Sequence, residues 1–431
     1  MKEQQFIPKL SKDEINHIQT NGLKWTVEHA VKNSPQYRAK FKEAGINPAD
    51  VTSLDDLQKL PLTTTEDLRA GYPLPLLSVP QNEVVRIHAS SGTTGKRKIL
   101  AYSKNDVDTF SLQMARCYEL AGLTTNDIVQ VAVGYGLWTA GAGFQLGSEK
   151  YGTLTVPVGA GNLDIHLQML TDLGTTCLGC TASMGLLMGE EVTRHKLKDK
   201  LKLKYAIFGA EGHSPKMRKT FEEQLGLEHS FNIGGMTEMY GPGTSLECRR
   251  HEGLHYWADL FIIEILDPET LKPVAPGEVG EMVVTSLRKE ASPLIRYRTR
   301  DLSRLLTGDC DCGCTMPRHD HLLGRSDDMI IFRGVNIYPG QIAEVLHGFE
   351  DIGSEYHLVL SRKEARDNML LKVELAKDKQ LGAEEIELLK PKLAKAVHTK
   401  LLISCEVEVV SYGDLPRSFG KTKRVTDERF L

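Results

Sequence analysis

The sequence of 431 residues has few cysteines, few aromatic residues and no long apolar run. Eight cysteines are too few to form the disulfide scaffold of a chain this long. No stretch approaches the roughly 20 apolar residues needed to cross a bilayer, and the polar N-terminal segment lacks the apolar core of a signal peptide. These absences predict a soluble, cytoplasmic protein without a membrane partner.

A strong charge of either sign is also lacking, because 53 basic and 57 acidic residues leave a formal net charge of −4. A general nucleic-acid binder presents a basic surface, so we expect no nucleic-acid partner. Apolar residues make up 41% of the chain and charged residues 26%, as in ordinary globular proteins. The length allows two or three domains.

The pattern of apolar residues changes along the chain. Between residues 128 and 233, β-rich runs alternate with helical stretches, which predicts α/β layers with parallel strands. After about residue 327, a mixed pattern predicts a small α+β domain. We therefore predict an α/β protein with a large N-terminal domain of layered sheets and helices at 1–326 and a small C-terminal domain at 327–431. The first 80 residues predict short amphipathic helices. The expected strands are 128–133, 153–158, 176–178, 205–208, 261–266, 281–286, 357–360, 370–374 and 406–410, and the expected later helices are 105–121, 163–173, 184–194, 216–225, 337–348 and 383–402.

A loop rich in Ser, Thr and Gly follows a short β-rich run. Its glycines allow backbone N–H groups to face an anion, and its hydroxyls and lysine can contact phosphate oxygens. The spacing does not match the Walker A motif. The loop predicts phosphate binding, with a flexible surface loop as the alternative. Its residues are Ser90, Ser91, Gly92, Thr93, Thr94, Gly95 and Lys96.

Three further segments carry side chains suited to a nucleotide. A glycine turn precedes Thr237 and Glu238, and a carboxylate there is a suitable Mg²⁺ ligand; an ordinary helix start is the alternative. Asp301 lies between basic residues, where it could bind a ribose diol or form a surface ion pair of little energetic value. Lys421 ends a basic glycine turn, which on its own is typical of a solvated tail.

Together, and in this order, these segments resemble the adenylate-forming superfamily, and within it the chain is most similar to the phenylacetate–CoA ligase family. The resemblance covers nearly the whole chain. It implies that ATP activates a phenylacetate-like aryl carboxylic acid as an acyl-adenylate, with release of pyrophosphate, and that coenzyme A then displaces AMP. The matching segments are 85–96, 135–137, 209–211, 293–301, 324–329 and 333–339.

The resemblance also implies roles for individual residues. A cation between the acid and the α-phosphate would stabilise the transition state, and a mobile C-terminal domain would rotate about a hinge between the two half-reactions. The implied roles are binding of the β- and γ-phosphates by residues 90–96, adenine contact by Gly209, Ala210 and Glu211, α-phosphate contact by Thr237, Mg²⁺ binding by Glu238, ribose binding by Asp301 and Arg325, bridging of the two anions by Lys421, and the hinge at Asp327.

The segment 131–139 matches the aromatic acid pocket of the family. Many members have Tyr where this chain has Val133 and Phe where it has Trp138, so we expect a pocket of altered shape. Tyr135 and Gly235 complete the predicted pocket. The expected substrate class is an arylacetate, and phenylacetate itself stays open; a plain core aromatic is the alternative for Trp138.

Three cysteines lie within five residues of one another, at Cys310, Cys312 and Cys314. Thiolates and imidazoles can form a closed tetrahedral zinc site, and some sequences similar to this family carry Cys-x-Cys-Gly here together with an earlier Cys and His. We therefore predict a structural Zn²⁺, with free cysteines as the alternative. The predicted ligands are Cys248, His255, Cys310 and Cys312, and the reserves are Cys314, His251, His319 and His321.

Two other functions stay open on sequence alone. The acyl group could pass to a carrier protein or an amine in place of coenzyme A, or the chain could be a catalytically silent nucleotide-binding protein. The joint presence of Lys96, Glu238, Asp301 and Lys421 counts against the silent protein. The expected partners are therefore small molecules (the acid, ATP and coenzyme A), and a homodimer is possible.

Overall fold

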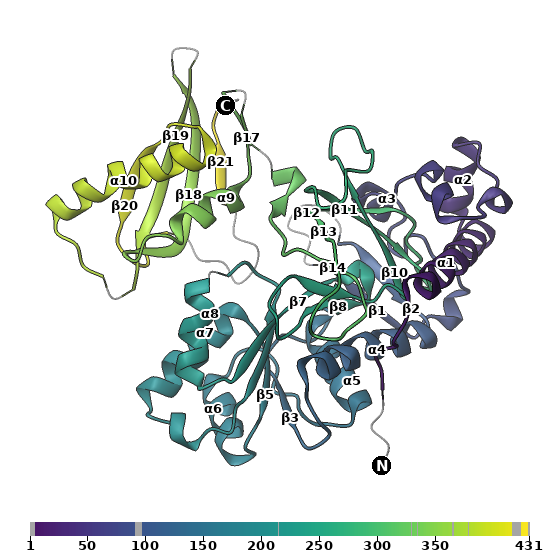
Figure 1. Cartoon of the computed structure of the whole chain (residues 1–431), viewed down its shortest axis with the longest axis horizontal. Coiled ribbons are helices and arrows are strands. Elements are labelled where there is room, and N and C mark those ends of the chain that lie inside the picture. The colour runs from purple at the N-terminus through teal and green to yellow at the C-terminus, as the bar shows by residue number, and fades with distance from the viewer. Residues whose placement is uncertain are drawn as a thin grey trace. The chain divides into compact units, whose positions relative to one another are not determined.

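The computed structural model describes residues 5–90, 97–213, 215–328, 330–333, 335–363, 366–377, 379–415 and 424–429. The chain divides into two compact units (Figure 1). The first contains residues 1–212, 217–299 and 303–321, and the second contains 213–216, 300–302 and 322–431. The predicted boundary at residue 327 stays a prediction.

A nine-stranded sheet forms the centre of the first unit, in the order β13-β14-β9-β8-β7-β6-β5-β3-β4. The strands from β3 to β7 pair in parallel, and β8, β9, β14 and β13 continue the sheet antiparallel. The strands are β3 Ile128–Val131, β4 Leu154–Val156, β5 Cys177–Thr181, β6 Tyr205–Gly209, β7 His229–Met236, β8 Gly241–Glu247, β9 Leu254–Tyr256, β13 Leu305–Leu306 and β14 Arg318–His319.

Helices connect the parallel strands, because a parallel pair requires a crossover connection. In Figure 1, α7 and α8 lie on one side of this sheet and α4 and α5 on the other. The helices that begin before residue 216 are α1 Lys12–Asn33, α2 Pro35–Glu43, α3 Thr65–Ala70, α4 Lys104–Ala121, α5 Ala140–Tyr151, α6 Leu163–Asp172, α7 Ala182–Arg194 and α8 Pro215–Leu225. Short 3₁₀ turns occur at Pro48–Asp50, Leu54–Lys59, Gln81–Glu83, Lys198–Lys200, Thr237–Met239 and Ser326–Asp328.

Two smaller sheets are separate from the nine-stranded sheet. Strands β1 and β2 form an antiparallel pair on either side of the predicted phosphate loop. Strands β10, β11 and β12 follow one another in a second sheet, and the end of β12 pairs with β15. Their bounds are β1 Arg86–Ala89, β2 Ile99–Tyr102, β10 Phe261–Leu266, β11 Gly280–Ser286, β12 Tyr297–Ser303 and β15 Gly324–Arg325.

The second unit has its own apolar core. A four-stranded sheet in the order β20-β19-β18-β21 combines one antiparallel and two parallel pairings, and α9 and α10 pack with it. A separate pair, β16 and β17, precedes the sheet. The elements are β16 Ile330–Phe332, β17 Val335–Ile337, α9 Pro339–Leu346, β18 Ile352–Lys363, β19 Arg366–Leu375, α10 Ala383–Leu401, β20 Glu406–Val410 and β21 Val425–Asp427.

Two helices differ from their predictions. Short helices were expected in the first 80 residues, but α1 runs for 22 residues. Its buried face includes Gln19 and Thr26, which donate to backbone carbonyls, and these polar residues interrupt the apolar stripe that would have indicated one long helix. A helix was also expected from residue 337, but α9 begins at Pro339, a residue favoured in the first helical turn.

Among the described residues, no helix is both long and apolar enough to span a membrane.

Candidate functional site

Thr237 and Glu238 lie in a buried 3₁₀ turn between β7 and β8. The approach to this turn is tight, because a Cβ atom at Gly235 would lie only 2.3 Å from the carbonyl oxygen of Gly241. Gly235 is itself exposed. Glycine therefore allows the two strands to converge directly before the two residues predicted to contact the α-phosphate and Mg²⁺.

The buried carboxylate of Glu238 forms an ion pair with the partly buried Lys98. The hydroxyl of Tyr297 donates to the same carboxylate oxygen at 2.9 Å. Burial opposes ionisation of Glu238, but the charge and hydrogen bond of Lys98 outweigh it, so the pKa of Glu238 lies below its usual value. An ionised oxygen donor of this kind fits the predicted Mg²⁺ ligand.

Two buried side chains hold the backbone of the same turn. The hydroxyl of Tyr102 donates to the carbonyl of Thr237 at 3.0 Å, and the ammonium of Lys289 donates to the carbonyl of Glu238 at 2.7 Å. Burial lowers the pKa of Lys289 to about 8. We did not predict Lys98, Tyr102, Lys289 or Tyr297 from the sequence. Two of them gave a signal: Lys98 is a basic residue two positions after the phosphate loop, and Tyr297 lies in the segment 293–301, which matches the family.

The predicted phosphate loop is only partly described, because Ser91, Gly92, Thr93, Thr94, Gly95 and Lys96 lie outside the described residues. Its first residue, Ser90, donates its backbone N–H to the carbonyl of Lys98 at 3.1 Å. The Ser90 hydroxyl oxygen is buried and has no hydrogen-bond partner among the described residues. The described residues on either side of the loop, Ser90 and Lys98, therefore come together, and Lys98 is the lysine that pairs with Glu238.

Gly209, Ala210 and Glu211, the predicted adenine contacts, follow β6. Gly209 stands opposite Ile233 of β7 in the parallel register, and a Cβ atom at Gly209 would lie 2.5 Å from the Ile233 carbonyl oxygen. The carboxylate of Glu211 accepts the backbone N–H of Ser183 in α7. Because β6 and β7 are parallel, these residues lie at the same sheet edge as the Thr237–Glu238 turn, where ligands of open α/β sheets bind.

The predicted acid pocket follows β3 at this edge. Val133 is buried, whereas Tyr135 is 38% exposed. Trp138 is partly buried and packs against the main core, and its ring lies 3.5 Å from where a Cβ atom at Gly134 would stand. Burial raises the pKa of Tyr135 to about 12. Trp138 therefore contributes to core packing, as the alternative interpretation held, and it also lies against the predicted pocket segment.

The pocket segment is hydrogen-bonded to β1, the strand that leads into the phosphate loop. The carbonyl oxygen of Leu137 accepts the backbone N–H of Ala89 at 2.8 Å and lies 3.2 Å from Nδ1 of His88. These contacts place the predicted acid pocket beside Ser90.

In the second unit, one arginine contacts both the predicted ribose ligand and the predicted hinge. Arg325 lies opposite Asp301 in the pairing of β15 with β12, and its guanidinium donates to the Asp301 carboxylate at 2.9 Å. The same guanidinium donates to Asp327 at 2.8 and 2.9 Å. Lys421 lies outside the described residues.

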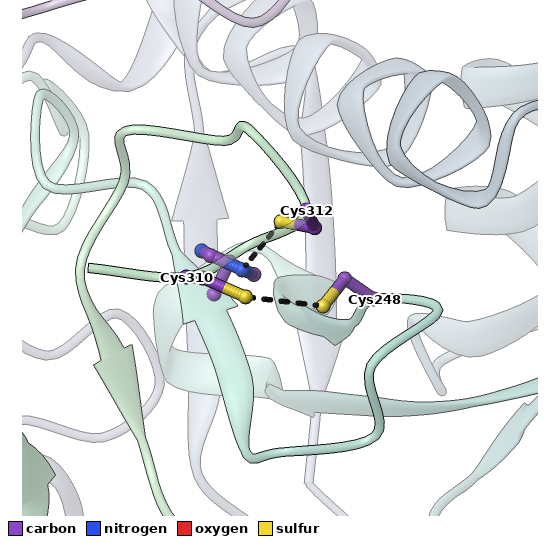
Figure 2. Close-up of side chains that lie close together, drawn as sticks. Cys248, Cys310 and Cys312 are labelled. Carbon is purple, nitrogen blue, oxygen red and sulfur yellow. Dashed lines mark hydrogen bonds between the residues drawn. The ribbon is translucent and has the colours of Figure 1, made fainter. Parts of the chain in front are cut away.

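The four predicted zinc ligands come together in the first unit. The donor atoms of Cys248, His255, Cys310 and Cys312 all lie within 4.8 Å of one another. Figure 2 shows the sulfur atoms of Cys248 and Cys310 facing each other, 3.7 Å apart. Tetrahedral zinc with Zn–S bonds of about 2.3 Å separates its sulfur ligands by roughly 3.8 Å. The arrangement therefore fits zinc.

The imidazole of His255 is oriented for such a site. Its Nδ1 lies 2.7 Å from the Met316 carbonyl oxygen, which can only accept, so Nδ1 carries the proton. Nε2 then presents its lone pair to the cluster, 3.3 Å from the Cys312 sulfur. A carbonyl that fixes the histidine tautomer is the usual neighbour of a metal-binding imidazole.

The four reserve ligands have other partners. Cys314 packs against the main core, and its backbone N–H faces the sulfur of Cys312 at 3.4 Å. His251 and His321 each lie 3.1 Å from the carboxylate of Glu247. His319 lies 2.8 Å from the hydroxyl oxygen of Ser245.

Comparison with known protein families assigns a class to this fold and site. Residues 8–287 match the AMP-binding enzyme family, and residues 334–429 match the AMP-binding enzyme C-terminal domain. The first match includes the turn with Glu238 and the segments of the predicted acid pocket. Fold and site thus define an adenylate-forming enzyme with a large N-terminal and a small C-terminal domain.

Curated relatives show to which family of adenylate-forming enzymes the chain belongs. The chain is 41% identical to the phenylacetate–coenzyme A ligase of Escherichia coli over 98% of this chain and 97% of that protein. It is 37% identical to the phenylacetate–coenzyme A ligase of Thermus thermophilus over the full length of both. The chain therefore belongs to the phenylacetate–coenzyme A ligase family.

Solved structures agree with this assignment. A 2-hydroxyisobutyryl-CoA ligase in its postadenylation state, in complex with R3-HIB-AMP, is 28% identical, with a TM-score of 0.87 over 97% of this chain and 91% of the other. The same ligase with 2-HIB-AMP and CoA in the thioesterification state gives a TM-score of 0.70 over 98% and 91%. The predicted fold class, family and AMP-forming acid–thiol ligase activity are thereby confirmed.

Proposed function

We propose that the protein activates an aryl carboxylic acid of the phenylacetate class with ATP and then transfers the acyl group to coenzyme A, releasing AMP and pyrophosphate. The relatives named phenylacetate–coenzyme A ligases support this substrate class. The observation that carries the proposal is the buried, ionised Glu238, paired with Lys98 beside the ends of the phosphate loop.

The chemistry requires activation because a free carboxylate is a poor electrophile with a poor leaving group. Attack of a carboxylate oxygen on the α-phosphorus breaks its bond to the oxygen bridging to the β-phosphate, so pyrophosphate leaves and an acyl-adenylate forms. The thiol of coenzyme A then attacks the acyl carbon and displaces AMP. A cation between the two anions stabilises the charge that develops in the first step, and this is the role we assign to Lys421. Mg²⁺ would neutralise phosphate charge when bound, and Glu238 would hold it.

The remaining nucleotide roles that we propose are those that the family resemblance implies. Asp301 would accept hydrogen bonds from the ribose hydroxyls, with Arg325 beside it. Thr237 would contact the α-phosphate. The residues 209–211 would lie by the adenine, and residues 90–96 would hold the β- and γ-phosphates.

For the acid, we assign Val133, Tyr135, Trp138 and Gly235 to the pocket. An apolar pocket with aromatic walls suits a flat aryl ring. Val133 is smaller and Trp138 larger than the residues common at these positions in the family, so the shape of the pocket would differ while the expected substrate class stays an arylacetate.

We also propose that Cys248, His255, Cys310 and Cys312 bind a structural Zn²⁺. The convergence of the four donor atoms and the orientation of His255 support the proposal. Four protein ligands leave no open position for a substrate, so the metal would be structural. It would join the loop before β14 to the connection between β8 and β9.

ATP–pyrophosphate exchange over a panel of aryl and alkyl acids tests the activity. We expect Mg²⁺-dependent exchange with arylacetates and, once coenzyme A is added, formation of the acyl-CoA detected by mass spectrometry. Release of AMP only with a carrier protein or an amine would contradict the proposed acceptor. Absence of exchange with every acid would indicate a silent nucleotide-binding protein.

Asp327→Pro is expected to slow thioester formation by about tenfold or more, while adenylate formation stays within about threefold. Proline fixes φ and so restricts rotation at the proposed hinge. Single-turnover rates for the two half-reactions provide the measurement. Asp327→Ala is the matched control, because it removes the same contact with Arg325 but leaves the backbone free. Equal effects of the two substitutions would argue against the hinge.

A further inference from the structure

Lys289 is completely buried in the first unit. Its ammonium group donates to the carbonyl of Glu238 at 2.7 Å and lies 5.0 and 5.1 Å from the ring centres of Tyr102 and Tyr240. Among the described residues, no carboxylate oxygen forms a salt bridge with it, and the negative charges that act on it are those of the more distant carboxylates of Asp106 and Glu238. Burying a cation without a direct counter-charge is costly, so the role of this lysine in the fold requires an explanation.

The contacts of Lys289 centre on the turn that carries the proposed metal ligand. Tyr102, whose ring faces the ammonium, donates its hydroxyl to the carbonyl of Thr237 at 3.0 Å. Lys289 and Tyr102 thus anchor two consecutive peptide groups. The turn ends at Tyr240, which has a left-handed backbone with φ of 70°, a conformation that non-glycine residues adopt only where surrounding contacts hold it.

The backbone that carries Lys289 is itself fixed. The carboxylate of Asp106 accepts the N–H groups of Glu290 at 2.8 Å and Ala291 at 2.9 Å. The same carboxylate accepts the backbone N–H of Ser103, the N-cap residue of α4, at 3.0 Å, and the Ser103 hydroxyl accepts the N–H of Asp106 at 3.1 Å. The position of the ammonium is therefore set by the start of α4 and not by the flexible lysine stem alone.

We propose that Lys289 is a positioning residue for the nucleotide half of the reaction. It holds the backbone of Glu238 so that the carboxylate of Glu238 and the hydroxyl of Thr237 meet the metal–nucleotide complex in a fixed arrangement. The inference rests on the proposed function of these two residues. A lysine that only stabilised the fold would support both half-reactions equally, whereas an anchor of the metal-binding turn matters to the step that uses Mg²⁺ and ATP.

Lys289→Met tests this role, because methionine keeps the apolar stem but removes the charge and the donor. We expect adenylate formation to slow by about 100-fold and the Mg²⁺ concentration for half-maximal rate to rise about tenfold, with transfer from a supplied acyl-adenylate to coenzyme A within about threefold of the unaltered protein. Tyr102→Phe, which removes only the hydroxyl on Thr237, should shift the same two quantities in the same direction by a smaller factor.

The matched control is Arg116→Met in α4, which removes another buried cation, one paired with Asp259 away from the turn. It should lower the melting temperature without separating the half-reactions. Proportional slowing of both half-reactions by Lys289→Met and Tyr102→Phe, or an unchanged Mg²⁺ requirement, would overturn the inference but leave the proposed function intact. Absence of Mg²⁺-dependent exchange in the unaltered protein would overturn the proposed function and the inference with it.

Discussion

Lys421→Ala is expected to slow adenylate formation by about a thousandfold, because no other cation is assigned to the space between the acid and the α-phosphate. Transfer of the acyl group from a supplied acyl-adenylate to coenzyme A should change by less than about threefold. The second step no longer joins two anions, so it does not require this charge. The separation of the two effects follows from the chemistry of the reaction.

Rapid-quench measurement of each half-reaction in single-turnover conditions provides the test. Lys423→Ala is the matched control, since it removes a positive charge two residues away in the same basic segment. We expect both half-reactions of this control to be nearly normal. Equal loss of the two half-reactions in Lys421→Ala would show that the lysine does not act at the adenylation step.

Cys312→Ser is expected to abolish zinc binding and to lower the melting temperature by on the order of 10 °C, because a structural metal contributes several kcal/mol to folding. The unaltered protein should contain one zinc ion per chain by elemental analysis. Differential scanning calorimetry, with and without a chelator, measures the change in stability. The chelator should destabilise the unaltered protein but not Cys312→Ser.

Cys314→Ser distinguishes the proposed ligand set from the alternatives. Cys314 lies two residues from Cys312 but packs against the main core, so its replacement should leave the zinc content unchanged. Loss of zinc in this variant would show that Cys314 belongs to the ligand set. Absence of zinc from the unaltered protein, with every thiol of the cluster reactive, would contradict the proposed zinc site.

Much of the central sheet could be predicted because its strands are short apolar runs separated by helices. The predicted strands at 205–208 and 261–266 correspond to β6 Tyr205–Gly209 and, in the second sheet, β10 Phe261–Leu266. Strands covered on both faces are apolar throughout, which makes them visible in a sequence. The order of the strands and the antiparallel extension from β8 to β13 depend on contacts distant in sequence and could not be predicted.

The candidate site was predictable where a residue type carries the chemistry directly. Cys-x-Cys with a distant Cys and His, a pattern that some similar sequences share, indicated a metal and the four proposed ligands; the fold adds that their donor atoms lie close together. Lys289 was not predictable, because Arg288, Lys289 and Glu290 form a charged run typical of a solvated surface. Its burial depends on Asp106, which binds the backbone of Glu290 from 184 residues away.

The proposed zinc site would also constrain the order in which this protein acquires its structure. Cys248 and Cys310 are 62 residues apart in the chain, and His255 stands opposite Arg318 only once β9 has paired with β14. Closing a loop of that length carries an entropic cost that pairing of the strands must meet first. A complete tetrahedral site for the proposed Zn²⁺ would therefore form only after this edge of the sheet has assembled. A chain that retains zinc would therefore be one in which β9 and β14 have paired as in the folded protein.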